Sequence, residues 1–171
     1  MSETLPRSVD AWRMVTARRS FVGQLPVERL KRLAQVLEGT DGQIDYEIDF
    51  GRDELGAAYF ALRATTSLTL LCQRTLEPFQ MPVKLDTRLG LISDESEESG
   101  LPPGYEPLLV EDNRVDPAAV IEDELLLVVP LVPVSPQSEW PEDGHDVGLE
   151  DVPPEAPEDN PFAVLRELKK H

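Results

Sequence analysis

The stretch DPAAVIEDELLLVVPLVPV, residues 116–134, is the longest concentration of apolar residues in the chain. Asp116 is a residue type that favours the helix N-cap, and Pro117 suits the first helical position, where a missing N–H has no cost. We therefore predict a helix that begins after Asp116, ends before Pro130 and packs against a sheet. At about 100° per residue, one stripe of this helix holds Ile121, Leu125 and Val128, with Val120, Leu127 and Val129 at its margins.

Three stretches of alternating apolar and polar residues precede this helix. The clearest covers residues 44–50, and longer ones cover residues 57–72 and 79–91. A two-residue period is typical of strands with one buried face, and short connections favour antiparallel pairing. The acidic residues 93–100 are expected to form a mobile loop, and residues 105–110 a fourth strand.

A second helix is predicted over residues 26–38. Its apolar face holds Val27, Leu30, Leu33, Ala34 and Leu37, and Gly39 suits the C-terminal cap. The expected fold is therefore α+β, with an antiparallel β-meander of three to five strands packed against helices, an acidic disordered linker and a short C-terminal helix.

The chain divides into four predicted parts. These are a basic arm (residues 1–24), an α+β core domain (25–134), an acidic, proline-rich linker (135–159) and a C-terminal amphipathic helix (160–171). The last helix places Phe162, Leu165 and Leu168 on one stripe but is too short to be stable alone. We therefore expect these residues to dock, either on the protein's own core or in a partner's groove.

The net charge of −17 is unevenly distributed. Residues 1–90 contain 12 basic and 12 acidic residues, residues 91–160 contain 1 and 20, and residues 161–171 contain 3 and 1. The three segments therefore carry net charges of 0, −19 and +2. The whole molecule is acidic, but a local basic surface near the amino terminus stays compatible with RNA.

Arginines near the amino terminus are interleaved with Trp12 and Phe21, a pattern that suits phosphate contact and base stacking. The alternative is an arm that lies on the domain with its aromatic residues buried and its arginines in water. The helix predicted over residues 26–38 also has a cationic outer face, which either contacts RNA or only lies in water. The RNA-binding candidates are Arg7, Arg13, Arg18, Arg19, Arg29, Lys31, Arg32 and Arg74.

Glu124 falls close to the buried face of the helix that follows Asp116, whereas Asp123 points the opposite way. A carboxylate at the edge of an apolar stripe must find a donor or shift its pKa. Arg74, at the tip of the hairpin predicted before Phe79, is a candidate donor. Glu124 and Arg74 therefore form a candidate structural ion pair, and the alternative is that Arg74 faces outward toward RNA phosphate.

Several function classes find no support in the residues. The two histidines, His145 and His171, lie in the predicted linker and at the last position, and no nucleophile elbow or glycine-rich phosphate loop is present. Cys72 is the only cysteine and is in phase with the apolar side of its strand, so we expect a small buried residue. We predict no catalytic residues, no metal and no cofactor. The lack of a signal peptide or apolar span predicts a cytoplasmic protein with no membrane contact.

Three strings carry a resemblance to a known family. They are CQRTLEPF (residues 72–79), LPPGYEPLLVEDNRVDPAAVIEDELLLVVPLVPV (101–134) and NPFAVLRELKK (160–170), and residues 10–34 are similar to the family's amino-terminal part. The chain resembles the YceD family of large ribosomal RNA subunit accumulation proteins. The resemblance implies a bacterial cytoplasmic protein needed for normal levels of 23S ribosomal RNA. Many members carry C-x-x-C where this chain has Cys72 and Thr75.

Two hypotheses follow from the charge pattern and the resemblance. The first is a non-enzymatic assembly factor that binds the 23S rRNA precursor or an early large-subunit particle. The second is an acidic adaptor or chaperone for a basic large-subunit ribosomal protein. An RNA-processing enzyme would need cleavage by the pure protein and a carboxylate whose removal stops it.

Overall fold

The computed structural model describes residues 5–138 of the chain. The predicted linker from residue 139 onward and the predicted helix with Phe162, Leu165 and Leu168 lie outside these residues. Within them the elements follow in the order β1 (Val9–Asp10), α1 (Ala11–Ala17), β2 (Ser20–Pro26), η1 (Val27–Arg29), α2 (Lys31–Ala34), β3 (Gln43–Arg52), β4 (Ala58–Leu71), β5 (Pro78–Ile92), η2 (Glu95–Gly100), β6 (Glu106–Leu109), β7 (Arg114–Val115) and α3 (Pro117–Val128).

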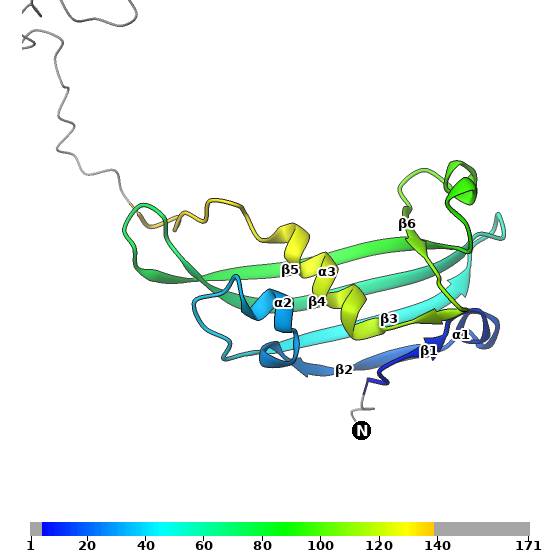
Figure 1. Ribbon diagram of the computed structural model, residues 1–171, viewed down its shortest axis with the longest axis horizontal. Helices are drawn as coiled ribbons and strands as arrows, with labels where there is room; N and C mark the ends of the chain where they lie inside the picture. The colour runs from blue at the N-terminus through cyan, green and yellow to red at the C-terminus, as the bar shows by residue number, and fades with distance from the viewer. Residues whose placement is uncertain (1–4, 139–171) are drawn as a thin grey trace, which may run out of the picture. The chain divides into compact units, whose positions relative to one another are not determined.

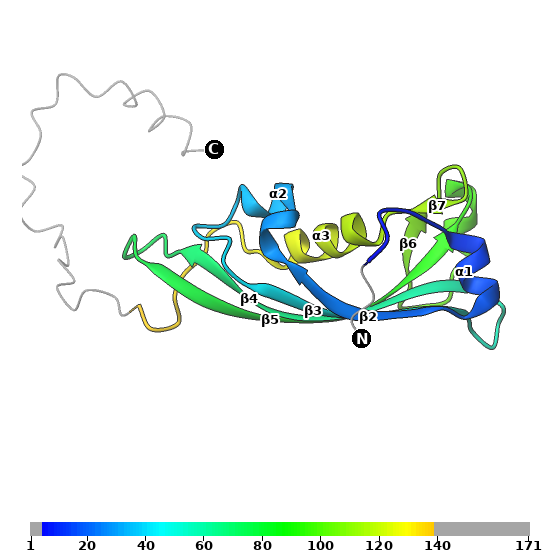
Figure 2. The same cartoon turned by 90° about the horizontal axis from the view of Figure 1, so that it is seen from below.

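A five-stranded sheet with the order β2-β3-β4-β5-β6 forms the centre of the described residues, and α2 and α3 lie over one of its faces (Figures 1 and 2). Strands β2 to β5 are antiparallel neighbours, as the alternating pattern predicts. The predicted α+β meander is therefore confirmed. Strand β6 differs, because it runs parallel to β5 at the edge.

The parallel edge strand follows from how the chain returns after β5. The acidic residues predicted as a loop contain the 3-10 helix η2, whose N-cap Asp94 accepts a hydrogen bond from Ser96 N. The chain then passes across the sheet, where Leu101 packs on Gly90 so closely that a Cβ at Gly90 would lie 2.4 Å from Leu101 Cδ2. A crossing segment of this kind brings β6 alongside β5 in the same direction.

Residues 9–26 belong to the fold rather than to an arm, which corrects the predicted boundary at residue 24. Helix α1 is capped by Asp10, which accepts from Arg13 N at 2.9 Å, and it buries Ala11 and Val15. Strand β2 pairs with β3 along its whole length. Both elements are hard to detect because α1 has few core positions and Gly23 interrupts the alternation between Phe21 and Leu25.

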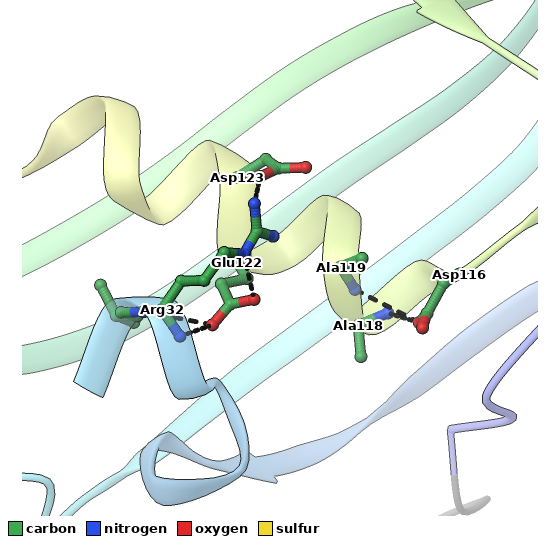
Figure 3. A network of polar contacts seen from close by, with 7 residues as sticks. Arg32, Asp116, Ala118, Ala119, Glu122 and Asp123 are labelled. Atoms are coloured by element: carbon green, nitrogen blue, oxygen red, sulfur yellow. Dashed lines mark hydrogen bonds and ion pairs between the residues drawn. The ribbon is translucent and has the colours of Figure 1, made fainter. Parts of the chain in front are cut away.

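Helix α3 begins and ends close to where the sequence predicts. Asp116 Oδ1 accepts from Ala118 N at 2.9 Å and from Ala119 N at 3.2 Å, and the helix stops at Val128 (Figure 3). Ile121 and Leu125 are fully buried, as expected, but Val128 is 41% exposed. The packed stripe at the end of α3 is therefore shifted from the predicted one, because Leu126 and Val129, and not Val128, pack against the core.

A buried carboxylate joins α3 to α2. Glu122 Oε1 accepts from Arg32 N at 2.7 Å and from Leu33 N at 3.1 Å, while Oε2 accepts from Arg32 Nε at 2.9 Å (Figure 3). Arg32 Nη1 also contacts Asp123 Oδ1 at 2.6 Å. Glu122 thus caps the amino-terminal end of α2 from another helix.

The same contact explains why the helix predicted over residues 26–38 is wrong in length. In a continuous helix the N–H groups of Arg32 and Leu33 would donate to carbonyls four residues earlier. Here they donate to Glu122, and Leu30 has the non-helical dihedrals φ −92° and ψ 89°. The segment therefore divides into the short elements η1 and α2, although Val27, Leu30 and Leu33 are buried as the pattern predicts.

Two leucines of α3 provide a direct test of this packing. Leu125 is fully buried, so Leu125→Ala is expected to lower the free energy of unfolding by about 2–5 kcal/mol. Leu127 is 75% exposed, so Leu127→Ala is expected to change it by less than about 0.5 kcal/mol. Urea unfolding followed by circular dichroism measures both, and equal losses would contradict the orientation of α3.

The contact between α2 and α3 can be tested with two adjacent carboxylates. Glu122→Ala removes the acceptor of two backbone N–H groups, so we expect the free energy of unfolding to fall by roughly 1–3 kcal/mol. Asp123→Ala removes an exposed partner of the same arginine and is expected to have a much smaller effect. The capping role of Glu122 is wrong if urea unfolding gives the two variants the same stability.

Candidate functional site

Three of the predicted RNA-binding residues lie together. Arg7, Arg29 and Lys31 line one cleft of about 620 Å³, whose wall also includes Glu28 and Asp116. Arg7 precedes β1, Arg29 ends η1, and Lys31 begins α2, so the contact between α2 and α3 also holds the backbone beside Lys31. We call these three residues the cleft cations.

The cleft cations have no competing ion pair within residues 5–138, where the salt bridges involve Arg32 and Arg63. All three side chains are exposed. Of the two acids in the cleft wall, Asp116 already accepts hydrogen bonds from two N–H groups of α3. The cleft therefore presents to an anionic group three cations that are in no salt bridge within residues 5–138. Glu28 is the acid in the wall that reduces their positive charge.

The remaining candidates are dispersed. Arg13 and Arg18 belong to α1 and its C-cap, and the Arg19 guanidinium lies 5.9 Å from the centre of the Phe21 ring. Arg74 lies in the hairpin between β4 and β5, at the opposite end of the sheet from α1 (Figure 1), and its Nη1 donates to Ser138 O at 2.6 Å. The predicted candidates therefore do not form one continuous surface.

Arg32, one of the predicted RNA-binding residues, is already paired within the fold. Hydrogen bonds to Asp123 and then to Glu122 raise the pKa of its guanidinium, so the charge is retained but already paired. Its side chain is 53% exposed, but two of its nitrogens already contact carboxylates. We therefore do not count Arg32 among the cleft cations.

The sequence-based candidates omit a group of arginines on the uncovered face of the sheet. Arg52, Arg63 and Arg88 line a hollow of about 300 Å³ together with Arg18 and Tyr59. Three of them have partners: Arg52 Nη1 donates to Gly56 O at 2.8 Å, Arg63 Nη1 pairs with Glu47 at 2.9 Å, and the Arg88 guanidinium lies 4.9 Å from the Tyr59 ring centre. The alternating pattern could have identified Arg63 and Arg88, because both fall on outward-facing positions of neighbouring strands.

The predicted ion pair between Glu124 and Arg74 is not among the salt bridges of the described residues. Glu124 is half-buried, and burial first, then Glu106 and Asp123, raise the pKa of its carboxyl group. The buried carboxylate of α3 that does find donors is Glu122, two residues earlier. Sequence periodicity could not identify it because its main donors are backbone N–H groups of α2.

Cys72 is fully buried, as expected, and its Sγ accepts a hydrogen bond from Ser135 N at 3.3 Å. Hydrogen bonds from the Thr75 side chain and from Ser135 lower the pKa of the Cys72 thiol to about 6. Thr75 stands where a C-x-x-C motif has its second cysteine. The threonine thus supplies a hydrogen bond where that motif has a second sulfur ligand.

Two kinds of site, a metal centre and a membrane-spanning helix, are absent from residues 5–138. No group of three or more His, Cys, Asp and Glu side chains in that part of the chain is placed to hold a metal ion. No helix there has the length and apolar content needed to cross a bilayer.

Comparison with known proteins identifies the family. The sequence model described as "Large ribosomal RNA subunit accumulation protein YceD" matches residues 60–169. The chain is also 27% identical over 168 residues to the large ribosomal RNA subunit accumulation protein YceD of Haemophilus influenzae, covering 97% of each chain. No solved structure matches the chain. These matches confirm the resemblance carried by the sequence motifs, and the chain belongs to the YceD family of large ribosomal RNA subunit accumulation proteins.

Proposed function

We propose that this protein is a non-enzymatic factor in large-ribosomal-subunit assembly that supports the accumulation of 23S rRNA. Membership of the YceD family, whose name refers to accumulation of the large ribosomal RNA subunit, supports the role in general terms. The proposed mechanism is direct contact with the rRNA precursor or with an early large-subunit particle.

The observation that carries this proposal is the cleft lined by Arg7, Arg29 and Lys31. Exposed cations that converge on one hollow and lack competing ion pairs suit the phosphate groups of RNA. The backbone of α2, which carries Lys31, is held by Glu122, so this part of the cleft is ordered before RNA arrives.

The acidic remainder of the chain limits where RNA can bind. With a net charge of −17, the molecule as a whole repels a polyanion. Contact is then confined to local cationic surfaces, and non-specific RNA binding is weak. A factor of this kind can associate with one RNA segment and leave it easily once assembly proceeds.

The cleft can be tested with the triple variant Arg7→Ala, Arg29→Ala, Lys31→Ala. Loss of three phosphate contacts is expected to weaken binding to precursor 23S rRNA and to make the negative slope of log K against log salt shallower by about 2. Fluorescence anisotropy with labelled rRNA fragments at several salt concentrations measures both quantities.

Lys84→Ala is the matched control, because Lys84 is an exposed cation that lies outside this cleft. Its slope should stay close to that of the unchanged protein. The proposal is overturned if the unchanged protein binds no rRNA, or if the triple variant and the Lys84 control show the same affinity and the same slope.

A further inference from the structure

Exposed apolar side chains are concentrated at the end of α3 and in the residues that follow it. Half of the large apolar residues that are exposed in the described part of the chain lie here: Leu127, Val128, Leu131, Val132 and Val134. Leu131 is fully exposed, and Leu127 is 75% exposed. We call these five residues the apolar run. Contiguous exposed apolar surface of this kind is typical of interaction sites.

The apolar run is held in place rather than free to collapse. Gln73 N donates to Pro133 O at 2.8 Å, and Ser135 N donates to Cys72 Sγ at 3.3 Å, so the turn between β4 and β5 fixes its far end. Val129 N donates to Leu125 O at 3.3 Å at its near end. Prolines at positions 130, 133 and 136 further restrict the backbone. A partner would therefore meet a surface that is already ordered.

A groove lies beside the apolar run. Its volume is about 420 Å³, and its apolar lining includes Val36, Leu37, Leu71, Leu126 and Leu131. Glu38 also lines it, whereas none of the lysines and arginines within residues 5–138 does. The groove can therefore accept apolar side chains and presents an acid at its edge.

Acidic residues also precede the apolar run on α3. Asp123 and Glu124 stand four and three residues before Leu127, the spacing that places helical residues on neighbouring positions of one face. Asp123 is already paired with Arg32, whereas Glu124 beside Leu127 and Glu38 in the groove are in no salt bridge within residues 5–138. A cation beside Glu124 would also offset the repulsion that this carboxylate receives from Glu106 and Asp123.

We propose that the apolar run and its groove dock a protein segment whose apolar side chains are flanked by lysine or arginine. The apolar side chains would cover Leu127 and Leu131, and the cations would pair with Glu38 and Glu124. This inference goes beyond RNA contact, because the surface is separate from the cleft cations and selects the opposite charge.

The probe is a synthetic amphipathic peptide built from leucine and lysine, labelled for fluorescence anisotropy. Leu127→Ser with Leu131→Ser is expected to weaken its binding to the full chain by at least about tenfold, because two exposed leucines lose their contacts. Val22→Ser with Leu55→Ser removes two exposed apolar residues elsewhere and should leave the affinity within about twofold.

Glu38→Gln with Glu124→Gln tests the charged part of the site. These two substitutions together are expected to weaken peptide binding and to reduce its dependence on salt. The control is Glu95→Gln with Glu97→Gln, which removes two acids from η2 and should change neither the affinity nor its salt dependence. A matched peptide with glutamate in place of lysine should not bind. All four double variants should keep the rRNA affinity of the unchanged protein. A failure of the docking proposal can therefore be told apart from a failure of the RNA proposal.

Three results would overturn the docking proposal. The first is peptide affinity that falls equally in the leucine variant and in its Val22 and Leu55 control. The second is a shift from dimer to monomer in sedimentation when Leu127 and Leu131 are replaced, because a second copy would then be the occupant. The third is tighter peptide binding when Phe162, Leu165 and Leu168 are all changed to Asp, because the chain's own end would then compete for the groove.

Discussion

The structure depends on one buried carboxylate that is used as a helix cap. Glu122 is buried to 7% exposure in an otherwise apolar layer, and it accepts three hydrogen bonds from α2. Burial of a charge is unfavourable unless donors compensate it, and here the donors come from a segment about 90 residues earlier in the chain. The contact therefore fixes the position of α2 on α3, accompanies the break in the helical path at Leu30 and holds the backbone beside Lys31, one of the cleft cations.

Much of the fold could be predicted because the sheet is uncovered on one face within residues 5–138. Asp45, Glu47 and Asp49 alternate with buried residues, so the two-residue period of β3 is directly visible in the sequence. The amino-terminal elements could not be predicted in the same way. Gly23 removes the apolar signal from β2, and the αL conformation of Arg18, with φ 48°, is unusual for a residue other than glycine.

The candidate site was only partly predictable, because sequence shows charge but not pairing. Arg32 and Lys31 are adjacent cations, yet the first is bound by two carboxylates and the second lines the cleft. On the open sheet face, Glu47, Arg63 and Asp86 lie in register across three strands, so an arginine there faces acids on both sides. The charge pattern of the sequence therefore does not show which arginines are available to bind RNA. The contacts that each guanidinium makes in the structure are a better guide.

The turn between β4 and β5 is closed by hydrogen bonds around a single sulfur atom. Cys72 is the only cysteine of the chain, and it is held by hydrogen bonds from Thr75 and Ser135. A hydroxyl cannot be oxidised to a disulfide and binds zinc poorly. The shape of this turn, and of the apolar segment that it holds, therefore rests on hydrogen bonds around one thiol, which neither a reductant nor a chelator removes.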